Sequence, residues 1–284
     1  MNNQPREIAA HVHRRFTVCG STDVGMERAG NQDTFVIADL AAHVVTRPCV
    51  STAVEVQQPG MLVVVCDGMG GRPAGDVAAK VAAKTIEKQI TEAGTAVVRS
   101  PGPVLEHAVH KANSAILATV RAHPEDHGMG TTCTAAVFGP DHLSVAQVGD
   151  SRAYLLRGGR LRLLTRDQTM ASDLLDAGVL KPEELHTFRY RHVLSQALGT
   201  DQRLNPVITD VELREGDRVL LCSDGLHGPV PDSSIAQILA TSSDAAHATQ
   251  ALIDAALDAG GPDNVTAVVA DCGPLVPTSR EGNA

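Results

Sequence analysis

Asp67 follows a run of apolar residues and precedes several glycines, which is a combination that can bind a cation. Residues Val63–Gly71 read Val-Val-Val-Cys-Asp-Gly-Met-Gly-Gly. The apolar, mostly β-branched start predicts a buried strand. An acid at the end of a strand can hold a divalent ion, and glycines let backbone or phosphate approach closely. An ordinary Asp-Gly turn explains the same residues, so this stretch alone does not decide between the two.

Three further aspartates end or border apolar runs, namely Asp150, Asp224 and Asp263. If the strands stack, these acids and Asp67 converge on one rim. Clustered carboxylates repel one another and need cations. Few histidines lie near them, so all-oxygen ligation indicates Mg²⁺ or Mn²⁺ rather than Zn²⁺. Two such ions suit the activation of water and the clamping of a phosphoryl group.

Arg28 is the residue whose chemistry suits the substrate end of such a site. A guanidinium binds phosphate through forked, charge-assisted hydrogen bonds. Taken alone, an arginine at this position would more often form a surface ion pair. Its assignment therefore depends on the rest of the site.

The composition limits the function classes. The chain has 284 residues, a hydrophobic fraction of 43%, no tryptophan and a net charge of −9. This charge argues against nonspecific binding to nucleic acid or to an anionic membrane. No apolar run reaches the roughly 20 residues of a membrane helix, and residues 1–10 lack the apolar region of a signal peptide. We therefore expect a cytoplasmic protein that acts without membrane or nucleic acid.

The cysteine pattern agrees with that compartment. None of the six cysteines forms a C-x-x-C pair, and Cys66, Cys133 and Cys222 lie inside strand-like apolar runs. We expect buried, reduced thiols rather than disulfides or a zinc site.

The elements that must position the acids are mostly strands in hairpins, with helices in pairs. This favours antiparallel sheets flanked by helices over a doubly wound parallel sheet. In the segment 74–90, Val77, Val81, Ile86 and Ile90 predict the buried helix face. The apolar residues of the segment 38–60 follow neither the helical nor the strand spacing, and we expect a strand end followed by an extended surface loop. Strands are expected at 15–22, 34–37, 63–66, 133–138, 143–148, 153–157, 160–164, 207–212, 218–222 and 265–270, and helices at 74–90, 104–122, 169–178, 232–240 and 244–259.

Eight short motifs, taken together and in order, resemble the metal-dependent protein phosphatases of the PP2C (PPM) family, and in particular its bacterial branch. The match covers roughly residues 15–272, and no single motif decides it. The motifs are Arg28…Asn31-Gln32-Asp33, Val65–Gly71, Gly130-Thr131-Thr132, Val148–Arg152, Leu164–Gln168, Leu198-Gly199, Ser223–Leu226 and Asp263–Thr266.

The resemblance implies an α+β fold, a four-layer αββα sandwich of two antiparallel sheets flanked by helix pairs. It implies one phosphatase domain at 15–272, with a flap at about 169–199, a flexible N-terminus at 1–14 and a flexible tail at 273–284. The implied activity is hydrolysis of phosphoserine and phosphothreonine in proteins, without a phosphoenzyme. The implied cofactors are two Mn²⁺ or Mg²⁺ ions in each active site, with a third in bacterial members.

The same resemblance assigns the site residues. Asp67 would bridge the two metals and Gly68 would contribute its backbone carbonyl, while Asp224 and Asp263 would bind the second metal. The remaining assignments are Asp33 to a metal-bound water, Asp150 to a third metal, Arg28 to the substrate phosphate, and Gln32 and Asn264 to supporting roles, with Asn264 positioning Asp263 by hydrogen bonding.

Two positions depart from the family pattern. The family often has Glu where this chain has Gln32, and a neutral amide is a weaker ligand. Some eukaryotic members have His after the Asp-Gly, but Met69 cannot donate a proton to a leaving group. Metal-bound water or a residue that the sequence does not identify must do that work.

The expected partners are phosphorylated proteins and a Hanks-type serine/threonine kinase whose action this monomeric enzyme reverses. The alternative is a catalytically weak module of the same fold that regulates one dedicated partner, although intact Asp67, Asp224 and Asp263 count against it. In the flap, Lys181, Arg189 and Arg191 would favour acidic phosphopeptides, but a solvated loop with incidental charge explains them equally well. His123, His192 and His227 lie in loops, and none is nominated as a ligand.

Overall fold

The strand that precedes Asp67 lies at the centre of the molecule and is covered on both faces. The computed structural model describes residues 12–42, 44–46, 52–56, 60–70 and 74–277. In β5 (Met61–Met69), Val63 and Val65 face one hydrophobic cluster, whereas Leu62, Val64 and Cys66 face another. Successive strand residues point to opposite faces, so a strand buried on both sides has a continuous apolar run.

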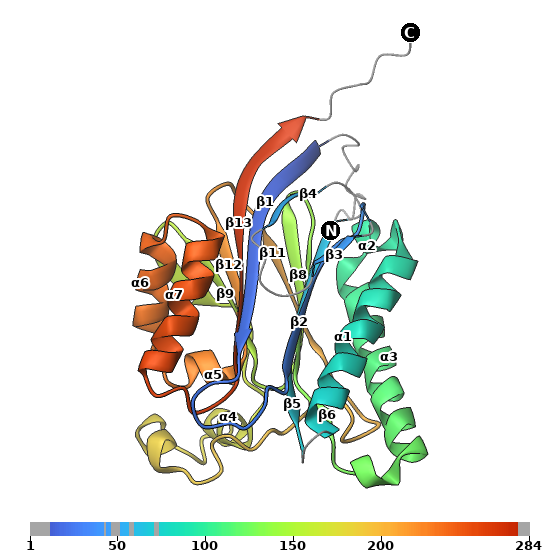
Figure 1. Ribbon diagram of the computed structural model, residues 1–284, viewed down its shortest axis with the longest axis vertical. Helices are drawn as coiled ribbons and strands as arrows, with labels where there is room; N and C mark the ends of the chain where they lie inside the picture. The colour runs from blue at the N-terminus through green and yellow to red at the C-terminus, as the bar shows by residue number, and fades with distance from the viewer. Residues whose placement is uncertain (1–11, 43, 47–51, 57–59, 71–73, 278–284) are drawn as a thin grey trace.

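The strands form two antiparallel sheets, which lie face to face (Figure 1). The first sheet has the spatial order β10 (Arg160–Leu163), β9 (Arg152–Arg157), β12 (Arg218–Cys222), β13 (Val265–Pro277), β1 (Val12–Asp23) and β4 (Thr52–Val56). The second has the order β11 (Val207–Glu212), β8 (His142–Val148), β7 (Cys133–Phe138), β5, β2 (Asp33–Asp39) and β3 (Val44–Thr46), and β6 (Gly130–Thr131) pairs with the end of β5.

Helix pairs form the outer layers (Figure 1). Helices α1 (Ala74–Ala93) and α3 (Pro101–Ala122), joined through the short α2 (Ala96–Arg99), cover the second sheet. Helices α6 (Asp232–Thr241) and α7 (Ala245–Asp258) cover the first sheet. The short helices are α4 (Met170–Asp176), α5 (Asp224–His227) and the 3₁₀ turns η1 (Pro124–Asp126) and η2 (Pro182–Thr187). This arrangement confirms the predicted αββα sandwich.

The buried face of α1 is wider than the predicted one. Alanines 78, 79, 82 and 83 lie in the core with Ile86 and Ile90, and Val77 and Val81 are partly buried and pack against the same core cluster. The four predicted residues therefore do contact the core, but the alanines, whose small side chains let the helix pack closely against β5 and α3, were not predicted.

In the segment 38–60 the strand end was correctly predicted, since β2 ends at Asp39. The extended loop was wrong where the structure describes the segment, because two edge strands lie there. Strand β3 pairs with β2, and β4 pairs with β1. Both strands form because their backbones pair with other strands of the sheets. The hydrophobic pattern within a short segment does not reveal such pairing. Positions 43, 47–51 and 57–59 of this segment lie outside the described residues.

The paired strands also extend past the expected domain limits of 15 and 272. Strand β1 begins at Val12 and pairs with β13 as far as Pro277. Arg14 is buried, and its guanidinium donates to the carbonyl oxygens of Gly273 at 2.7 Å and Leu213 at 3.5 Å. This anchoring explains why residues 12–14 and 273–277 belong to the sheet. Residues 1–11 and 278–284 lie outside the described residues.

Five cysteines are buried thiols, and the described residues contain no disulfide, as predicted. Cys49 lies outside the described residues. None of the helices in the described ranges is long and apolar enough to cross a membrane.

Candidate metal centre

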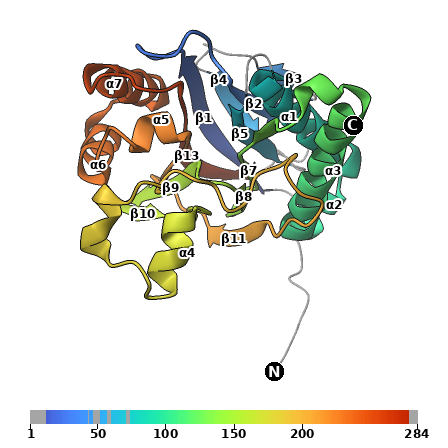
Figure 2. The same ribbon diagram turned by 90° about the horizontal axis from the view of Figure 1, so that it is seen from below.

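The predicted acids meet at one end of the sandwich, which Figure 2 views from below. Asp33 is the first residue of β2 and stands directly opposite Asp67 of β5 in the strand register. Asp150 directly follows the turn that ends β8, and Asp224 begins α5 directly after β12 and Ser223. Asp263 lies two residues before β13. Residues far apart in the chain therefore meet because the ends of their strands lie at the same edge.

Burial and mutual repulsion act on these carboxyl groups together. Burial, opposed by two hydroxyl hydrogen bonds and reinforced by the charges of Asp224 and Asp263, raises the pKa of Asp33 to about 7. Burial and the charge of Asp224 raise the pKa of Asp150 to about 8. Burial raises the pKa of Asp67 as well, and Asp33, Asp224 and Asp150 add to the effect. Such a cluster is unfavourable while ionised and without cations.

Two carboxylate oxygens show where positive charge fits. The Oδ2 atom of Asp33 accepts hydrogen bonds from Ser223 Oγ and Thr266 Oγ1, each at 2.7 Å. Among the described residues, neither Asp33 Oδ1 nor Asp224 Oδ1 finds a hydrogen-bond partner, although both are buried. A buried oxygen without a partner requires an explanation such as a water or an ion. All-oxygen groups of this kind suit Mg²⁺ or Mn²⁺.

The side chains of the described residues do not form a complete metal-binding cage. Within the described ranges, no three His, Cys, Asp or Glu side chains surround one point as a complete ligand set. Mg²⁺ commonly keeps several waters and uses one or two protein carboxylates. The adjacent carboxylates therefore fit ions that stay partly hydrated. The metal roles predicted for Asp33, Asp67, Gly68, Asp150, Asp224 and Asp263 stay predictions.

The backbone of Asp67 is held through both its amide and its carbonyl group. Its amide donates to Thr132 Oγ1 at 2.9 Å, and its carbonyl accepts from the Thr132 amide at 2.8 Å and from Thr131 Oγ1 at 2.9 Å. These contacts give the Thr-Thr motif a structural role, because they hold the backbone of Asp67 in place. A Cβ at Gly68 would lie 2.2 Å from the Gly75 carbonyl oxygen, so only glycine fits beside Asp67.

The loop that carries Asp150 is fixed by glutamines on two sides. The Gly149 amide donates to Gln168 Oε1 at 2.8 Å, and the Gln168 amide returns a hydrogen bond to the Gly149 carbonyl at 2.9 Å. Gln147 Nε2 also donates to that carbonyl, at 3.1 Å. His227 Nε2 donates to the carbonyl of Asp150 at 3.0 Å.

Arg28 lies at the exposed edge of the site. Its side chain is 54% exposed, and Nη2 forms a 2.6 Å ion pair with Asp263 Oδ2. The residue predicted to bind phosphate thus contacts a predicted metal ligand directly. Because the guanidinium is exposed, it can also reach an anion beside Asp263.

Asn264 forms the predicted hydrogen bond to Asp263 and also supports a second loop. Its backbone amide donates to Asp263 Oδ1 at 2.8 Å. The side chain instead donates to the carbonyls of Val24 and Gly30 and accepts from the Gln32 amide at 2.7 Å. The Gln32 side chain donates to the Gly70 carbonyl at 3.5 Å. Asn264 therefore fastens the loop that carries Arg28.

The segment predicted as a flap, 169–199, contains α4 and η2 and lies at the same end of the molecule (Figures 1 and 2). Thr169 caps α4 by accepting from the Ser172 amide at 3.2 Å, and Gly178 has a φ of 68° just after the helix. This agrees with the helix predicted at 169–178, and Gly178 takes the left-handed conformation common just past a helix end. Lys181, Arg189 and Arg191 are exposed.

Sequence reasoning missed several residues that hold the acids, above all Ser223, Thr266, Gln147 and His227. Ser223 and Thr266 lay within recognised motifs, but which acid they contact was not predicted. Ser223 and Asp33 are separated by 190 positions, and Thr266 and Asp33 by 233. Only the paired strands bring them together.

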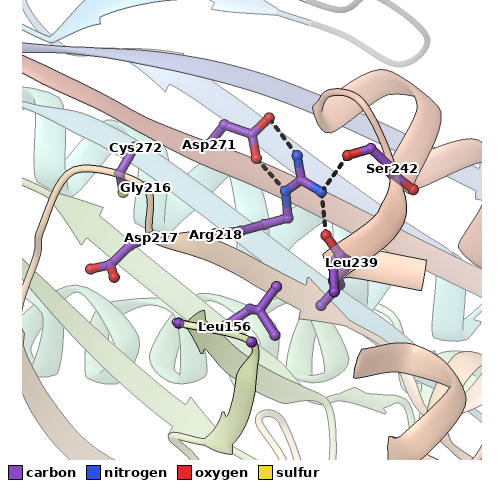
Figure 3. A pocket seen from close by; sticks show the side chains of 11 residues that line it. Leu156, Gly216, Asp217, Arg218, Leu239, Ser242, Asp271 and Cys272 are labelled. Atoms are coloured by element: carbon purple, nitrogen blue, oxygen red, sulfur yellow. Dashed lines mark hydrogen bonds and ion pairs between the residues drawn. The ribbon is translucent and has the colours of Figure 1, made fainter. Parts of the chain in front are cut away.

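A cavity of about 410 Å³ lies at the other end of the first sheet (Figure 3). Its wall includes Arg218 at the start of β12, whereas Asp224 follows the end of that strand. Arg218 donates to both carboxylate oxygens of Asp271 and to the carbonyls of Leu239 and Ser242. These contacts tie α6 to the sheet, so this hollow is structural and separate from the candidate metal centre.

The structure is thus a two-sheet sandwich with helix pairs outside, and at one of its ends two buried carboxylate oxygens have no partner among the described residues. The family model for protein phosphatase 2C matches residues 50–259. The chain therefore belongs to the protein phosphatase 2C family, as its motifs predicted.

Curated relatives include bacterial phosphatases. The chain is 44% identical over 211 residues to the serine/threonine protein phosphatase PstP of Mycobacterium tuberculosis, covering 74% of this chain and 40% of PstP. It thus spans less than half the length of that relative. It is 31% identical over 247 residues to the protein phosphatase PhpP of Streptococcus pneumoniae, covering 86% of this chain and 93% of PhpP.

Solved structures share the fold. The M. tuberculosis PstP/Ppp crystal structure is 36% identical, has a TM-score of 0.78, and covers 92% of this chain and 100% of that one. The catalytic domain of PstP, crystallised with two manganese ions, is also 36% identical, with a TM-score of 0.75 and coverage of 93% and 100%. A Streptococcus agalactiae serine/threonine phosphatase is 26% identical, with a TM-score of 0.80 and coverage of 90% and 99%.

Proposed function

We propose that this protein hydrolyses phosphoserine and phosphothreonine in phosphorylated proteins, with Mn²⁺ or Mg²⁺ at the carboxylate cluster. The observation that carries the proposal is the pair of buried oxygens, Asp33 Oδ1 and Asp224 Oδ1, without partners in the described residues, among carboxylates that repel one another. Family membership supports the reaction class. The related PstP catalytic domain bound two manganese ions in its crystal, which supports two ions here.

In this proposal Asp67, the Gly68 carbonyl oxygen, Asp224 and Asp263 would hold the two ions. Asp33 would hold a water bound to them, and Asp150 would hold a third ion. When bound, the ions supply charge that activates water and stabilises the phosphoryl group during displacement.

The chain's own residues contribute position and charge. Ser223 and Thr266 fix one oxygen of Asp33 and so aim the other into the cluster. Thr131 and Thr132 hold the backbone of Asp67. Arg28 would leave Asp263 and bind the substrate phosphate. Its exposed guanidinium can make this change because it stays paired with a negative charge, first the carboxylate and then the phosphate. Met69 cannot protonate the leaving alcohol, so the proton must come from water or from another residue.

The biological setting follows from the chemistry. We propose that the substrates are products of a Hanks-type serine/threonine kinase in the same cytoplasm, and that the protein acts as a monomer. The basic residues of the flap would favour phosphorylated segments rich in acidic side chains.

The test uses purified protein, a phosphothreonine peptide and p-nitrophenyl phosphate. We expect Mn²⁺-dependent release of phosphate that EDTA abolishes. Asp224→Asn removes a charge from the cluster and should lower kcat at least a hundredfold, whereas Asp258→Asn on the exposed end of α7 should not change it. A rate for Asp224→Asn within a fewfold of the wild type would refute the metal assignment.

A further inference from the structure

A single turn of helix joins two of the predicted metal-binding loops. Helix α5 contains only Asp224–His227, so its first and last side chains are three positions apart and share one face. Asp224 contributes to the carboxylate cluster, where its charge adds to burial in raising the pKa of Asp150. His227 Nε2 lies 3.0 Å from the carbonyl oxygen of Asp150. A carbonyl can only accept, so Nε2 carries the hydrogen.

This contact lies where the chain crosses from the second sheet to the first. Asp150 lies between β8 of the second sheet and β9 of the first, and β9 pairs with β12, the strand that precedes α5. On the other side of Asp150, Gly149 exchanges two hydrogen bonds with Gln168. Those bonds hold the loop to its own sheet and to the base of the flap. Pairing of Arg152 with Cys222 holds the other end of the loop beside β12, and the bond from His227 adds a contact from α5 to Asp150 itself.

The contact matters because the two carboxylates repel each other. In the proposed site Asp224 serves one of the two ions and Asp150 serves a third, so a shift of Asp150 away from Asp224 would change the spacing of these neighbouring ligands. Affinity for a partly hydrated ion depends on how well its few protein ligands are pre-positioned. A hydrogen bond to the backbone of Asp150 restrains it without occupying the carboxylate.

We propose that His227 is a positioning residue for divalent-cation binding, and that it sets the position of Asp150 relative to Asp224 through its Nε2–H. This inference rests on the proposed function for the presence of the cation. It assigns His227 no contact with substrate and no part in proton transfer.

Two polar variants of similar size provide the test. In His227→Gln the amide nitrogen can take the position of Nε2, whereas in His227→Asn the side chain is one carbon shorter and cannot reach the carbonyl. Mn²⁺ binding to the metal-free full chain is measured by isothermal titration calorimetry. We expect His227→Gln to bind Mn²⁺ within about twofold of the wild type, and His227→Asn to show a roughly fivefold to tenfold weaker apparent affinity, as the loss of one buried hydrogen bond gives.

A second measurement separates positioning from folding. Thermal unfolding without metal should differ little between His227→Gln and His227→Asn, and the Mn²⁺ concentration for half-maximal hydrolysis of p-nitrophenyl phosphate should rise only for His227→Asn. His247→Asn, on the exposed face of α7, is the matched control and should bind Mn²⁺ as the wild type does.

Equal Mn²⁺ affinities for the two variants would overturn the proposal, whether both are normal or both are weak. So would a normal affinity for His227→Asn. Because calorimetry measures binding without turnover, a wild type that binds Mn²⁺ but hydrolyses no phosphoester would refute the proposed function and leave this inference to be decided by the same titrations.

Discussion

The side chain of Asp33 is held in place through one carboxylate oxygen, while the other oxygen lacks a hydrogen-bond partner among the described residues. Two hydroxyl donors satisfy Oδ2, while Oδ1 is buried without a partner in the described part of the chain. Hydrogen bonds to the ionised form favour it, but burial and nearby carboxylates oppose ionisation more strongly, which leaves the pKa near 7. Near neutral pH, a proton and a metal ion therefore compete for the carboxylate of Asp33.

This balance predicts a pH-dependent gain in stability for Asp33→Asn in the metal-free protein. A raised pKa in the folded state means stability that is complete below the ordinary value of 3.8 and is lost as pH rises through about 7. Asparagine cannot ionise, and its amide oxygen can still accept from Ser223 and Thr266. We expect Asp33→Asn to match the wild type near pH 4 and to exceed it near pH 8, by at most roughly 4 kcal/mol at about 1.4 kcal/mol per pKa unit.

Chemical denaturation in EDTA at several pH values measures this difference. Asp258→Asn, on an exposed part of α7, should show no such trend. A gap between Asp33→Asn and the wild type that stays constant from pH 4 to pH 8 would show that Asp33 is not a strained carboxylate.

At the scale of elements, the site depends on loops that are fastened to the sheets by side chains. The residues between β1 and β2 carry Arg28, and the Asn264 side chain makes three hydrogen bonds to that connection. The flap is fastened likewise, because the Ser195 amide donates to the Gln168 carbonyl at 2.8 Å and Gln168 binds Gly149. Rigid sheets thus position loops that can exchange partners at their tips.

Comparison of Asn264→Ala with Arg28→Ala tests this fastening. Asn264→Ala leaves partly buried loop groups unpaired and should lower the free energy of unfolding by about 1–3 kcal/mol, and it should also raise KM because Arg28 loses its support. Arg28→Ala removes an exposed side chain, so it should raise KM tenfold or more with little change in stability. Denaturation and phosphopeptide kinetics on both variants distinguish the two roles. If Asn264→Ala leaves both quantities unchanged, the loop is held by other contacts.

At the scale of the whole molecule, the sequence predicted those features of the fold that a local pattern of residues encodes. The apolar run before Asp67 and the order of the eight motifs were sufficient to predict the sandwich and the acids that meet. The edge strands β3 and β4 were missed because pairing with β2 and β1 defines them. The alanine face of α1 was missed because close packing favours small residues there. The contacts of Ser223, Thr266 and His227 require the assembled fold, since their partners are remote in sequence.

Because the carboxylate cluster joins several strands, we expect the free energy of unfolding of the whole molecule to depend on bound metal. This dependence should be stronger at high pH. Cations compete with protons for Asp33 and Asp150, whose pKa values are raised to about 7 and about 8. Mn²⁺ should therefore stabilise the protein strongly near pH 8 and weakly near pH 5. At a concentration one hundred times its dissociation constant, an ion contributes about 2.7 kcal/mol, which for a domain of this size is roughly 5 °C or more in Tm. Thermal unfolding at both pH values, with Mn²⁺ or with EDTA, measures the effect, and Asp67→Asn should weaken it. A shift in Tm of equal size at pH 5 and pH 8 would mean that Mn²⁺ binds elsewhere, because groups with ordinary carboxylate pKa values are already ionised at pH 5.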